Sequence, residues 1–377
     1  MKIKLLNFFV IIGQFILNLI YSVMKLKKTK NKVLLLSRQS NKKSLDFSLL
    51  EESLKKHKNI KIVCMYKMIG KSFISKIGYC FYMLRIMNNL ANSKVCIIDG
   101  YSIPISLLKH KKDLVIIQMW HASGATKKFG YQVVDKKEGA SLEITKIMKM
   151  HKNYDYVLAP SKKTGEIYSE AFNIPEDKIV YIGLPRLDYL KDRSKDDKLK
   201  EEFLKAYPKY SNKEIILYVP TFRKGKEISS YDLISKINNE KYGLIIRKHP
   251  LDIEKEDNDF IVDKRFETMD LLKIADIIIT DYSAIAYESC ILNKPLYFYV
   301  YDIMEYIENR GLNIDIAKEM REATFKKAET LVKSIESNMY NYSQLYDFRD
   351  KYVEVYKKNN TEELTEFIIK NMNNSSK

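Results

Sequence analysis

Short apolar runs alternate with longer amphipathic stretches along the chain after residue 30. Short runs rich in Val, Ile and Tyr are typical of buried strands, and the stretches between them have the length of crossover helices. This rhythm predicts an α/β fold with parallel sheets. Strands are expected at residues 32–36, 60–66, 94–99, 114–119, 156–159, 179–183, 214–219, 243–248, 260–262, 274–280 and 295–299.

Chain length divides this series of strands into two lobes. The chain has 377 residues, and domains of about 150 residues each predict two cores rather than one. A charged, helix-prone stretch at 191–207 interrupts the strands and is followed by Pro208. We expect a membrane-associating helix with a basic flank at 1–30, Rossmann-like lobes at 31–190 and 191–341, and a helical tail at 342–377.

The first thirty residues carry a membrane signal, because residues 5–24 are almost continuously apolar and lysines flank them on both sides. A cleaved signal peptide, a spanning helix and a helix in the membrane interface are the three interpretations. No small-residue cleavage site is found, and a narrow polar stripe favours the interface. The basic flank predicts a peripheral or monotopic protein on the cytoplasmic face of the cell membrane. The stripe consists of Lys4, Asn7, Gln14, Asn18, Tyr21, Ser22 and Lys25.

The net charge of +17 predicts an anionic partner. The sequence has no RNA-recognition signature, zinc-finger spacing or basic region with heptads, so no nucleic acid is expected. An anionic membrane surface and a phosphorylated substrate remain. The four cysteines lack CxxC spacing, which argues against a zinc site or a disulfide framework and fits a reducing cytoplasm. No carboxylate cluster calls for a metal, and no cofactor is expected.

Polar residues directly after the predicted strands are candidates for the active site, because ligands of open α/β sheets bind at the carboxyl ends of strands. His121 follows the strand at 114–119 and can act as a general base, since its ordinary pKa lies near cytoplasmic pH. Lys248 and His249 end a strand of the second lobe, so His249 is expected to face the same cleft. A purely structural role is the alternative for each histidine.

Phosphate-binding groups are expected in the second lobe. Thr280, Asp281 and Ser283 lie between a strand and a predicted helix at 284–292, where free N–H groups and a hydroxyl can hold a phosphate. A plain helix cap is the alternative for Ser283.

Two arginines are further candidates in the second lobe. Arg223 follows another strand, and Arg310 lies beyond Asp302. Both arginines are suited to neutralise a pyrophosphate through forked hydrogen bonds, with a surface position as the alternative.

Two parallel lobes in series suggest the GT-B arrangement, in which donor and acceptor meet in a cleft between the lobes. The motifs, taken in order, resemble the CDP-glycerol glycerophosphotransferase family of teichoic acid enzymes. The resemblance runs from about residue 90 to 315, and an ordered set is more specific than any single motif. It rests on Trp120-His121, residues 183–188, residues 220–223, residues 248–250, residues 280–283 and Asp302 to Gly311.

Residues 118–130 resemble the short primase-type members more than the long polymerases, which typically carry Trp-His-Gly at this place. Ser123 stands where Ala is expected of a primase. The resemblance implies that His121 is the base for the acceptor hydroxyl and that His249 and Ser283 hold the donor pyrophosphate. Supporting contacts to the phosphates are implied for Arg223 and Arg310, and less directly for Asp302.

The reaction implied by the resemblance is transfer of glycerol phosphate from CDP-glycerol to an undecaprenyl-diphosphate-linked disaccharide of the ManNAc-GlcNAc type. This step belongs to wall teichoic acid biosynthesis and releases CMP. Three alternatives remain open: a short glycerol- or ribitol-phosphate extender of the same family, a GT-B glycosyltransferase that uses a nucleotide sugar, and a non-catalytic membrane-binding protein.

Overall fold

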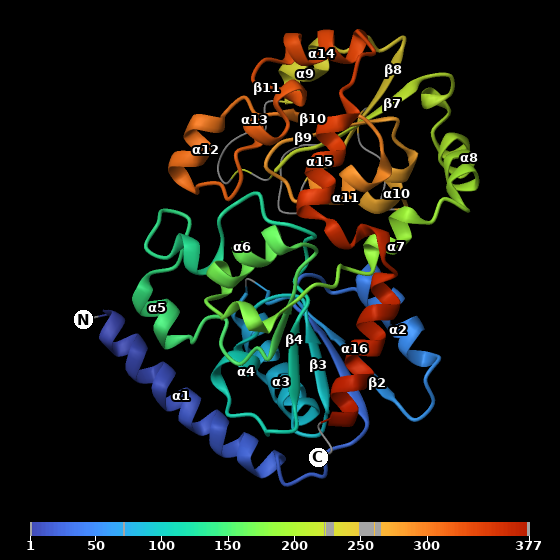
Figure 1. Cartoon of the computed structure of the whole chain (residues 1–377). Helices are drawn as coiled ribbons and strands as arrows, with labels where there is room; N and C mark the ends of the chain where they lie inside the picture. The colour runs from blue at the N-terminus through green and yellow to red at the C-terminus, as the bar shows by residue number, and fades with distance from the viewer. Residues whose placement is uncertain are drawn as a thin grey trace. The chain divides into compact units, whose positions relative to one another are not determined.

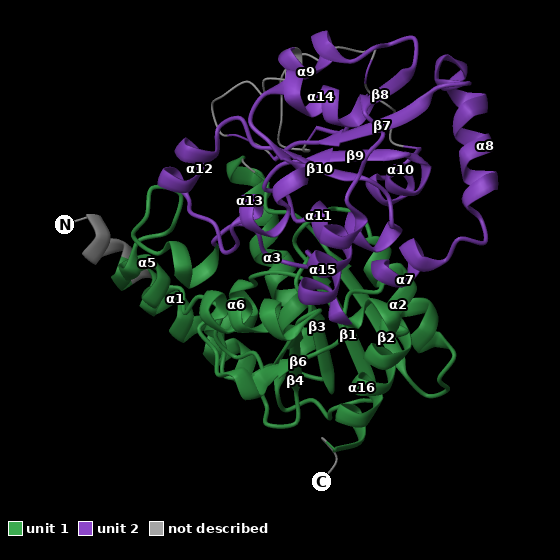
Figure 2. Ribbon diagram, turned by 45° about the horizontal axis from the view of Figure 1, so that its top comes forward, with its two compact units in different colours: residues 1–121, 129–185, 355–377 green, residues 122–128, 186–354 purple. Residues whose placement is uncertain are grey.

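The structure is a computed structural model that describes residues 2–70, 72–221, 223, 230–248, 260 and 265–374. The chain forms two compact α/β units (Figures 1 and 2). Unit 1 contains Met1–His121, Phe129–Pro185 and Val355–Lys377, and unit 2 contains Ala122–Lys128 and Arg186–Glu354. Each unit is built on one sheet in which all pairs are parallel, so the predicted α/β fold with parallel sheets is confirmed.

The sheet of unit 1 has six strands in the order β2-β1-β3-β4-β5-β6. Its central strand β1 is buried at every position, as expected for a parallel strand that is covered on both faces. The strands are β1 (Lys32–Ser37), β2 (Lys61–Tyr66), β3 (Val95–Ile98), β4 (Val115–Gln118), β5 (Tyr156–Leu158) and β6 (Ile179–Val180).

Helices from both ends of unit 1 pack on this sheet. Leu50 and Leu54 of α2 share one buried core with Leu364 and Ile368 of α16, and Figure 1 shows α16 beside α2. Serine side chains cap α2 and α3, which fixes where both helices begin. The helices are α1 (Lys2–Met24), α2 (Leu45–Lys55), α3 (Phe73–Leu90), α4 (Ile103–Leu107), α5 (Leu142–Ile147), α6 (Lys162–Phe172) and α16 (Asn360–Asn374), with short 3₁₀ turns at Gly130–Val133 and Glu176–Lys178.

The sheet of unit 2 has five strands in the order β11-β10-β9-β7-β8. Read from the other edge, this order is β8-β7-β9-β10-β11. When the strands of unit 2 are numbered from one along the chain, the order becomes 2-1-3-4-5, the same as in the first five strands of unit 1. The order reverses between β1 and β3 in unit 1 and between β7 and β9 in unit 2, and such switch points are where open α/β sheets bind ligands. The strands are β7 (Glu214–Val219), β8 (Tyr242–Ile246), β9 (Ile277–Thr280), β10 (Leu296–Tyr299) and β11 (Thr324–Phe325).

Short helices join the strands of unit 2, and the helical tail is shared between the units. Helix α15 lies in unit 2, whereas α16 lies in unit 1, with a 3₁₀ turn at Glu354–Lys357 between them. The helices of unit 2 are α7 (Arg186–Lys191), α8 (Asp196–Ala206), α9 (Ser230–Lys236), α10 (Thr268–Ile274), α11 (Ile285–Ser289), α12 (Ile303–Asn309), α13 (Ile316–Glu319), α14 (Ala328–Glu336) and α15 (Tyr342–Tyr352), with 3₁₀ turns at Pro208–Tyr210, Cys290–Leu292 and Arg321–Ala323.

Two predicted strands of unit 2 differ from the structure. The strand expected at 274–280 begins only at Ile277, because Ile274 is the last residue of α10. The strand expected at 260–262 falls mainly outside the described residues. Strand β11 was not predicted, since two residues are too few to show a pattern.

The N-terminal segment forms helix α1, and Gln14, Asn18 and Tyr21 of its polar stripe contact the rest of unit 1. Gln14 and Asn18 donate to the carbonyl of Leu107 at 3.1 and 3.3 Å, and Tyr21 is buried with its hydroxyl 3.1 Å from His110 Nδ1. Within the part of the chain that the structure describes, no helix is long and apolar enough to cross a membrane.

Candidate active site

His121 follows a sharp turn at the carboxyl end of β4 in unit 1. Trp120, which precedes it, has a φ of 63°, a left-handed conformation that is rare for a bulky side chain. The Trp120 N–H donates to Gln118 Oε1 at 2.9 Å, and the indole stacks on Phe129 with 4.9 Å between ring centroids. The turn directs His121 to the carboxyl edge of the sheet, where its imidazole contacts Gln39, which follows β1, and Asp99, which follows β3.

Contacts with the backbone assign a tautomer to His121. Its Nδ1 lies 3.0 Å from the carbonyl oxygen of Asp99, and a carbonyl can only accept a hydrogen bond. In a neutral ring this contact places the proton on Nδ1 and leaves on Nε2 the lone pair that a general base needs. The amide of Gln39 lies beside the same nitrogen, with Nε2 at 3.2 Å from Nδ1. The oxygen and nitrogen of an amide can be exchanged by a half-turn, and with the oxygen facing the ring Gln39 also accepts from Nδ1.

Gln39 and Asp99 show that His121 lies at the switch point of unit 1, because Gln39 follows β1 and Asp99 follows β3. A Cβ atom at Gly100 would lie 2.7 Å from Gln39 Nε2, so glycine makes room for the Gln39 side chain. Neither Gln39 nor Asp99 was predicted as a site residue. The rule that identified His121, a polar residue directly after an apolar strand, also applies to Asp99.

Asp99 is a buried carboxyl group beside this turn. Its side chain is 4% exposed, and Oδ1 has no hydrogen-bond partner among the described residues. Burial raises the pKa of Asp99 to about 6, although a hydrogen bond from Ser37 opposes the shift. The switch point of unit 1 thus combines an imidazole with a buried carboxyl group whose pKa is raised to about 6.

The segment that follows His121 is anchored in unit 2. Ser123 donates to Glu288 Oε1 through its hydroxyl at 2.9 Å and its N–H at 3.3 Å. Glu288 is buried, which raises the pKa of its carboxyl, and Arg186 Nη1 lies 3.4 Å away. Gly124 packs so closely on the Tyr287 ring that a Cβ atom would clash. Glu288 was missed because nothing in the sequence separates it from other glutamates of a helix.

The switch point of unit 2 holds a buried ionic network. Thr221, after β7, donates to Asp281, after β9, through its N–H at 2.9 and 3.0 Å and its hydroxyl at 2.6 Å. Arg223 donates to Asp281 at 2.7 Å and to both oxygens of Asp302 at 2.6 and 3.0 Å. Arg223 is 8% exposed and Asp281 is fully buried. Residues predicted from three separate motifs therefore meet in one network.

Aromatic rings enclose this network. The Tyr282 hydroxyl donates to Asp302 Oδ1 at 3.0 Å, and its ring stacks on Tyr306. The Arg223 guanidinium lies 5.2–5.8 Å from three tyrosine rings, those of Tyr282, Tyr301 and Tyr306. Burial opposes ionisation of Asp302, but the Arg223 hydrogen bonds outweigh it and hold the pKa of Asp302 below its ordinary value. Arg223 is thus neutralised by protein carboxylates.

The other predicted site residues of unit 2 have varied surroundings. Thr280 is buried and donates to the Val219 carbonyl at 2.8 Å, whereas Ser283 is half-buried and accepts from the Ile285 N–H at 3.4 Å. Arg310 Nε donates to the Lys128 carbonyl at 3.2 Å.

Lys248 is half-buried just after β8, and His249 lies outside the described residues. In residues 2–248 and 265–374, as far as they are described, no group of three or more His, Cys, Asp or Glu side chains could hold a metal ion.

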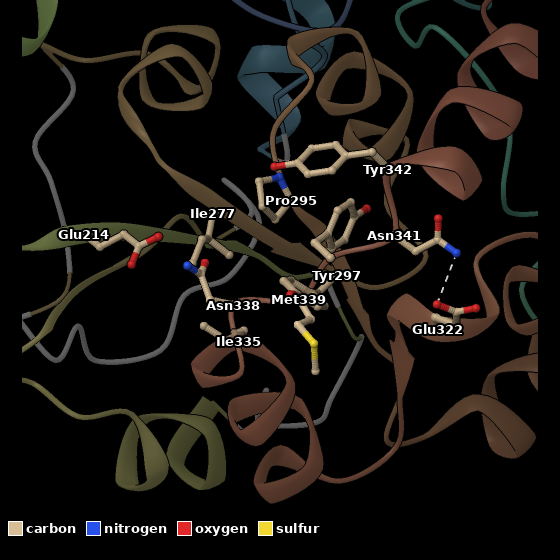
Figure 3. A pocket seen from close by; sticks show the side chains of 11 residues that line it. Glu214, Ile277, Pro295, Tyr297, Glu322, Ile335, Asn338, Met339, Asn341 and Tyr342 are labelled. Carbon is tan, nitrogen blue, oxygen red and sulfur yellow. Dashed lines mark hydrogen bonds between the residues drawn. The ribbon is translucent and has the colours of Figure 1, made fainter.

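A cavity of about 490 Å³ in unit 2 lies apart from these residues (Figure 3). Its lining includes Glu214, Ile277 and Pro295, at the amino ends of β7, β9 and β10, along with Tyr297 and Tyr342. This is the edge of the sheet opposite to the Arg223 network, and no predicted site residue lines the cavity.

Most of this chain matches one family of known proteins. Residues 18–370 match the family described as CDP-glycerol:poly(glycerophosphate) glycerophosphotransferase. The teichoic acid ribitol-phosphate primase of Bacillus spizizenii is 31% identical over 321 residues, which cover 82% of each chain. The teichoic acid glycerol-phosphate primase of Bacillus subtilis is 31% identical over 365 residues, which cover 90% of this chain and 92% of the relative.

A polymerase and two solved structures extend the comparison. The teichoic acid poly(ribitol-phosphate) polymerase of Bacillus spizizenii is 30% identical over 79% of this chain but only 49% of its own length. The structure of the wall teichoic acid polymerase TagF matches with a TM-score of 0.74 over 99% of both chains at 19% identity. UDP-GlcNAc 2-epimerase from Neisseria meningitidis matches with 0.56 over 90% of this chain and 100% of the other at 15% identity. These two likenesses concern the fold alone.

Proposed function

This chain belongs to the CDP-glycerol:poly(glycerophosphate) glycerophosphotransferase family, and we propose that it adds one glycerol phosphate from CDP-glycerol to an undecaprenyl-diphosphate-linked disaccharide of the ManNAc-GlcNAc type, releasing CMP. The chain is an enzyme of the CDP-glycerol glycerophosphotransferase class. The observation that supports its chemistry best is the 3.0 Å contact of His121 Nδ1 with the Asp99 carbonyl at the switch point of unit 1, which leaves the lone pair of a neutral ring on Nε2.

The proposed reaction is a single displacement at phosphorus. His121 Nε2 takes the proton of the acceptor hydroxyl while the hydroxyl oxygen bonds to the β-phosphorus of CDP-glycerol. The bond from this phosphorus to the bridging oxygen breaks, and that oxygen leaves with CMP. Phosphoryl transfer of this kind depends mainly on positioning and on cations around the phosphoryl oxygens.

Residues of unit 2 divide into two proposed groups. Lys248, His249, Ser283 and Arg310 are proposed to bind the pyrophosphate of the donor in a cleft of the GT-B type. The second group, Arg223, Asp281, Asp302 and Thr280, is proposed to hold the strand ends in place. The donors of Arg223 are engaged with two carboxylates and a carbonyl, which favours positioning over direct contact with phosphate.

Primase activity is proposed over chain extension because residues 118–130 resemble the primase-type members. A glycerol-phosphate primase is 31% identical to this chain over 92% of its own length. A ribitol-phosphate primase is equally similar at 31% identity, so ribitol phosphate is the second candidate for the transferred group. An acceptor sugar differs in shape from a terminal polyol, and one addition removes the preferred nucleophile.

Helix α1 is proposed to place the enzyme on the cytoplasmic face of the cell membrane. Its apolar side carries Phe15 and Leu19, which are 70% and 61% exposed, and the neighbouring α3 exposes Phe73 and Ile74 by 76% and 82%. An apolar surface of this kind marks an interaction site. Lysines after α1 would add attraction to anionic lipids.

Flotation with anionic vesicles tests the membrane proposal. The double variant Phe15→Glu with Leu19→Glu should lose vesicle binding yet keep transfer to a soluble acceptor, whereas Glu366→Gln on the exposed face of α16 should bind normally. Vesicle binding that survives the double change would show that another surface carries the protein to membranes.

The proposed reaction is tested by incubating the purified protein with a synthetic lipid-linked disaccharide and either CDP-glycerol, CDP-ribitol or a UDP-sugar, followed by mass spectrometry. We expect one glycerol phosphate and one CMP per acceptor. A ladder of products would identify an extender. Addition of ribitol phosphate would show that CDP-ribitol is a donor, and transfer from the UDP-sugar would identify a glycosyltransferase. Absence of product with all three donors would contradict the proposed reaction.

A further inference from the structure

Gln118 is a fully buried amide at the carboxyl end of β4 that bonds to two backbone groups. Its Oε1 accepts from the Trp120 N–H at 2.9 Å, and its Nε2 donates to the Gly100 carbonyl at 3.2 Å. We propose that Gln118 is a positioning residue for His121, an inference that rests on the proposed role of His121 as the base. Gln118 holds the backbone that orients the His121 ring, and does not itself contact substrate.

The two bonds of Gln118 reach both sides of the contact that orients the imidazole. Gly100 is the residue after Asp99, whose carbonyl accepts from His121 Nδ1, and Trp120 is the residue before His121. One amide therefore ties the end of β3 to the end of β4 at the place where their relative position sets the 3.0 Å contact. A shift of either strand end would move the imidazole away from Asp99 and turn Nε2 from its direction.

The turn at Trp120 needs a restraint of this kind. A left-handed backbone is disfavoured for residues with a large side chain, so the chain around Trp120 would relax toward an ordinary conformation if it were free to do so. The indole packs on Phe129 and lies edge-on to Phe172 at 5.1 Å. These ring contacts hold the side chain, whereas the Gln118 bond holds the peptide that begins the turn.

The alternative is that Gln118 merely satisfies two buried backbone groups. Such a residue contributes stability, but its loss would lower activity only as far as the protein unfolds. A positioning residue changes the turnover of folded enzyme, because misplacement of a catalytic group by about 1 Å can lower a rate a hundredfold.

The first experiment compares Gln118→Met with Thr365→Val. Both substitutions keep side-chain volume and remove buried hydrogen bonds in unit 1, but Thr365 bonds only to Ser53 and its own helix, away from His121. For Gln118→Met we expect kcat to fall about 10- to 100-fold with KM for CDP-glycerol within about twofold. Thr365→Val should leave both constants near wild type. A kcat for Gln118→Met within twofold of Thr365→Val overturns the proposal.

Tryptophan fluorescence supplies a readout without substrate. Trp120 is the only tryptophan of the sequence, and its ring centroid lies 4.1 Å from that of His121. Emission and quenching therefore report on this turn alone. Gln118→Met should shift the emission and increase quenching by acrylamide, whereas Thr365→Val should match wild type. Unchanged emission in Gln118→Met overturns the proposal. Because the measurement needs no substrate, this outcome can be distinguished from failure of the proposed function.

A second variant keeps the proposal testable if Gln118→Met does not fold. Gln118→Glu retains an oxygen that can accept from the Trp120 N–H but loses the N–H that donates to the Gly100 carbonyl. Its kcat should therefore fall, by less than that of Gln118→Met, while KM for CDP-glycerol stays within about twofold. A kcat equal to that of wild type would show that the bond to Gly100 does not help to orient His121, and would overturn the proposal.

Discussion

The two units place chemically different residues at the same topological position. Both sheets reverse their strand order after the first strand of the unit. In unit 1 this point holds the half-buried imidazole of His121, whose Nδ1 contacts the Asp99 carbonyl, beside a carboxyl group whose pKa is raised to about 6. In unit 2 it holds Arg223, which forms ion pairs with the carboxylates of Asp281 and Asp302. The same fold can thus serve proton transfer in one unit and positioning in the other.

The difference shows what each task requires of the protein. A general base must keep a lone pair available to substrate, so its remaining contacts fix its tautomer and direction only. A buried charged group that organises a loop must instead have its hydrogen bonds satisfied, because an unpaired buried charge is strongly destabilising. Variants of the first group should therefore lose activity, and variants of the second should lose stability.

The largest expected effect is on activity in unit 1. His121→Ala should lower kcat by about a hundredfold to ten-thousandfold, the usual contribution of a general base. The free energy of unfolding should change by only about 1 kcal/mol, because the ring is half-buried and lies outside the apolar core. Transfer assays and urea denaturation measure the two quantities.

The exposed His57 provides the matched control, since His57→Ala should leave both quantities unchanged. A His121→Ala enzyme with a kcat within threefold of wild type would remove the contrast between the two units.

Arg223→Met should produce the largest loss of stability. The change leaves Asp281 and Asp302 buried without their cation, and loss of one member of a buried ion pair costs about 3–5 kcal/mol. Urea denaturation measures this loss. Lys333→Met, which breaks the exposed pair with Glu329 in the same unit, should change stability little. A small effect of Arg223→Met would show that the network is dispensable and that Arg223 serves another purpose.

The sequence was sufficient to predict most strands and several of the polar residues that lie at the carboxyl edges of the two sheets. Apolar runs locate strands well because a parallel strand is buried on both faces, and the polar residue after each run lies at the binding edge of the sheet. This reasoning found His121, Arg223, Asp281 and Asp302. That the last three would neutralise one another was not predictable, since the pairing depends on how three loops converge in space.

Other features were out of reach for the same reason. Gln118 is the last residue of an apolar strand, and only the left-handed backbone of Trp120 shows what its amide holds. The polar stripe of α1 was identified, but not its packing against Leu107 and His110. A stripe on a helical wheel shows which residues share a face and does not show what covers that face.

The buried carboxyl of unit 1 should give a pH-dependent stability. Burial raises the pKa of Asp99 from its ordinary 3.8 to about 6, so between these values the folded protein binds a proton more tightly than the unfolded chain. Asp99 therefore favours folding below about pH 4, and this contribution is lost as the pH rises through 6. The change corresponds to at most about 3 kcal/mol.

Asp99→Asn should remove this pH dependence. The unfolding free energies of wild type and variant, measured from pH 4 to 7, should diverge in favour of the variant as the pH rises. Asp177→Asn, at an exposed position, should run parallel to wild type. A difference between wild type and Asp99→Asn that is constant over this range would show that the carboxyl does not titrate there, and would weaken the contrast with the ionised network of unit 2.

The smallest expected effect concerns the edge of that network. Tyr282→Phe removes the hydroxyl that donates to Asp302 at 3.0 Å but keeps the ring that stacks on Tyr306. A hydrogen bond to a charged group contributes about 1.5–3 kcal/mol, and the lower value is expected because Asp302 still receives two bonds from Arg223. Urea denaturation of the single variant and of its combination with Asp302→Asn measures the coupling between the two side chains. The loss caused by Tyr282→Phe should shrink when Asp302 no longer carries a charge. An equal loss in both backgrounds would show that the Tyr282 hydroxyl stabilises the unit independently of the charge on Asp302, leaving Arg223 as the partner that holds Asp302 in place.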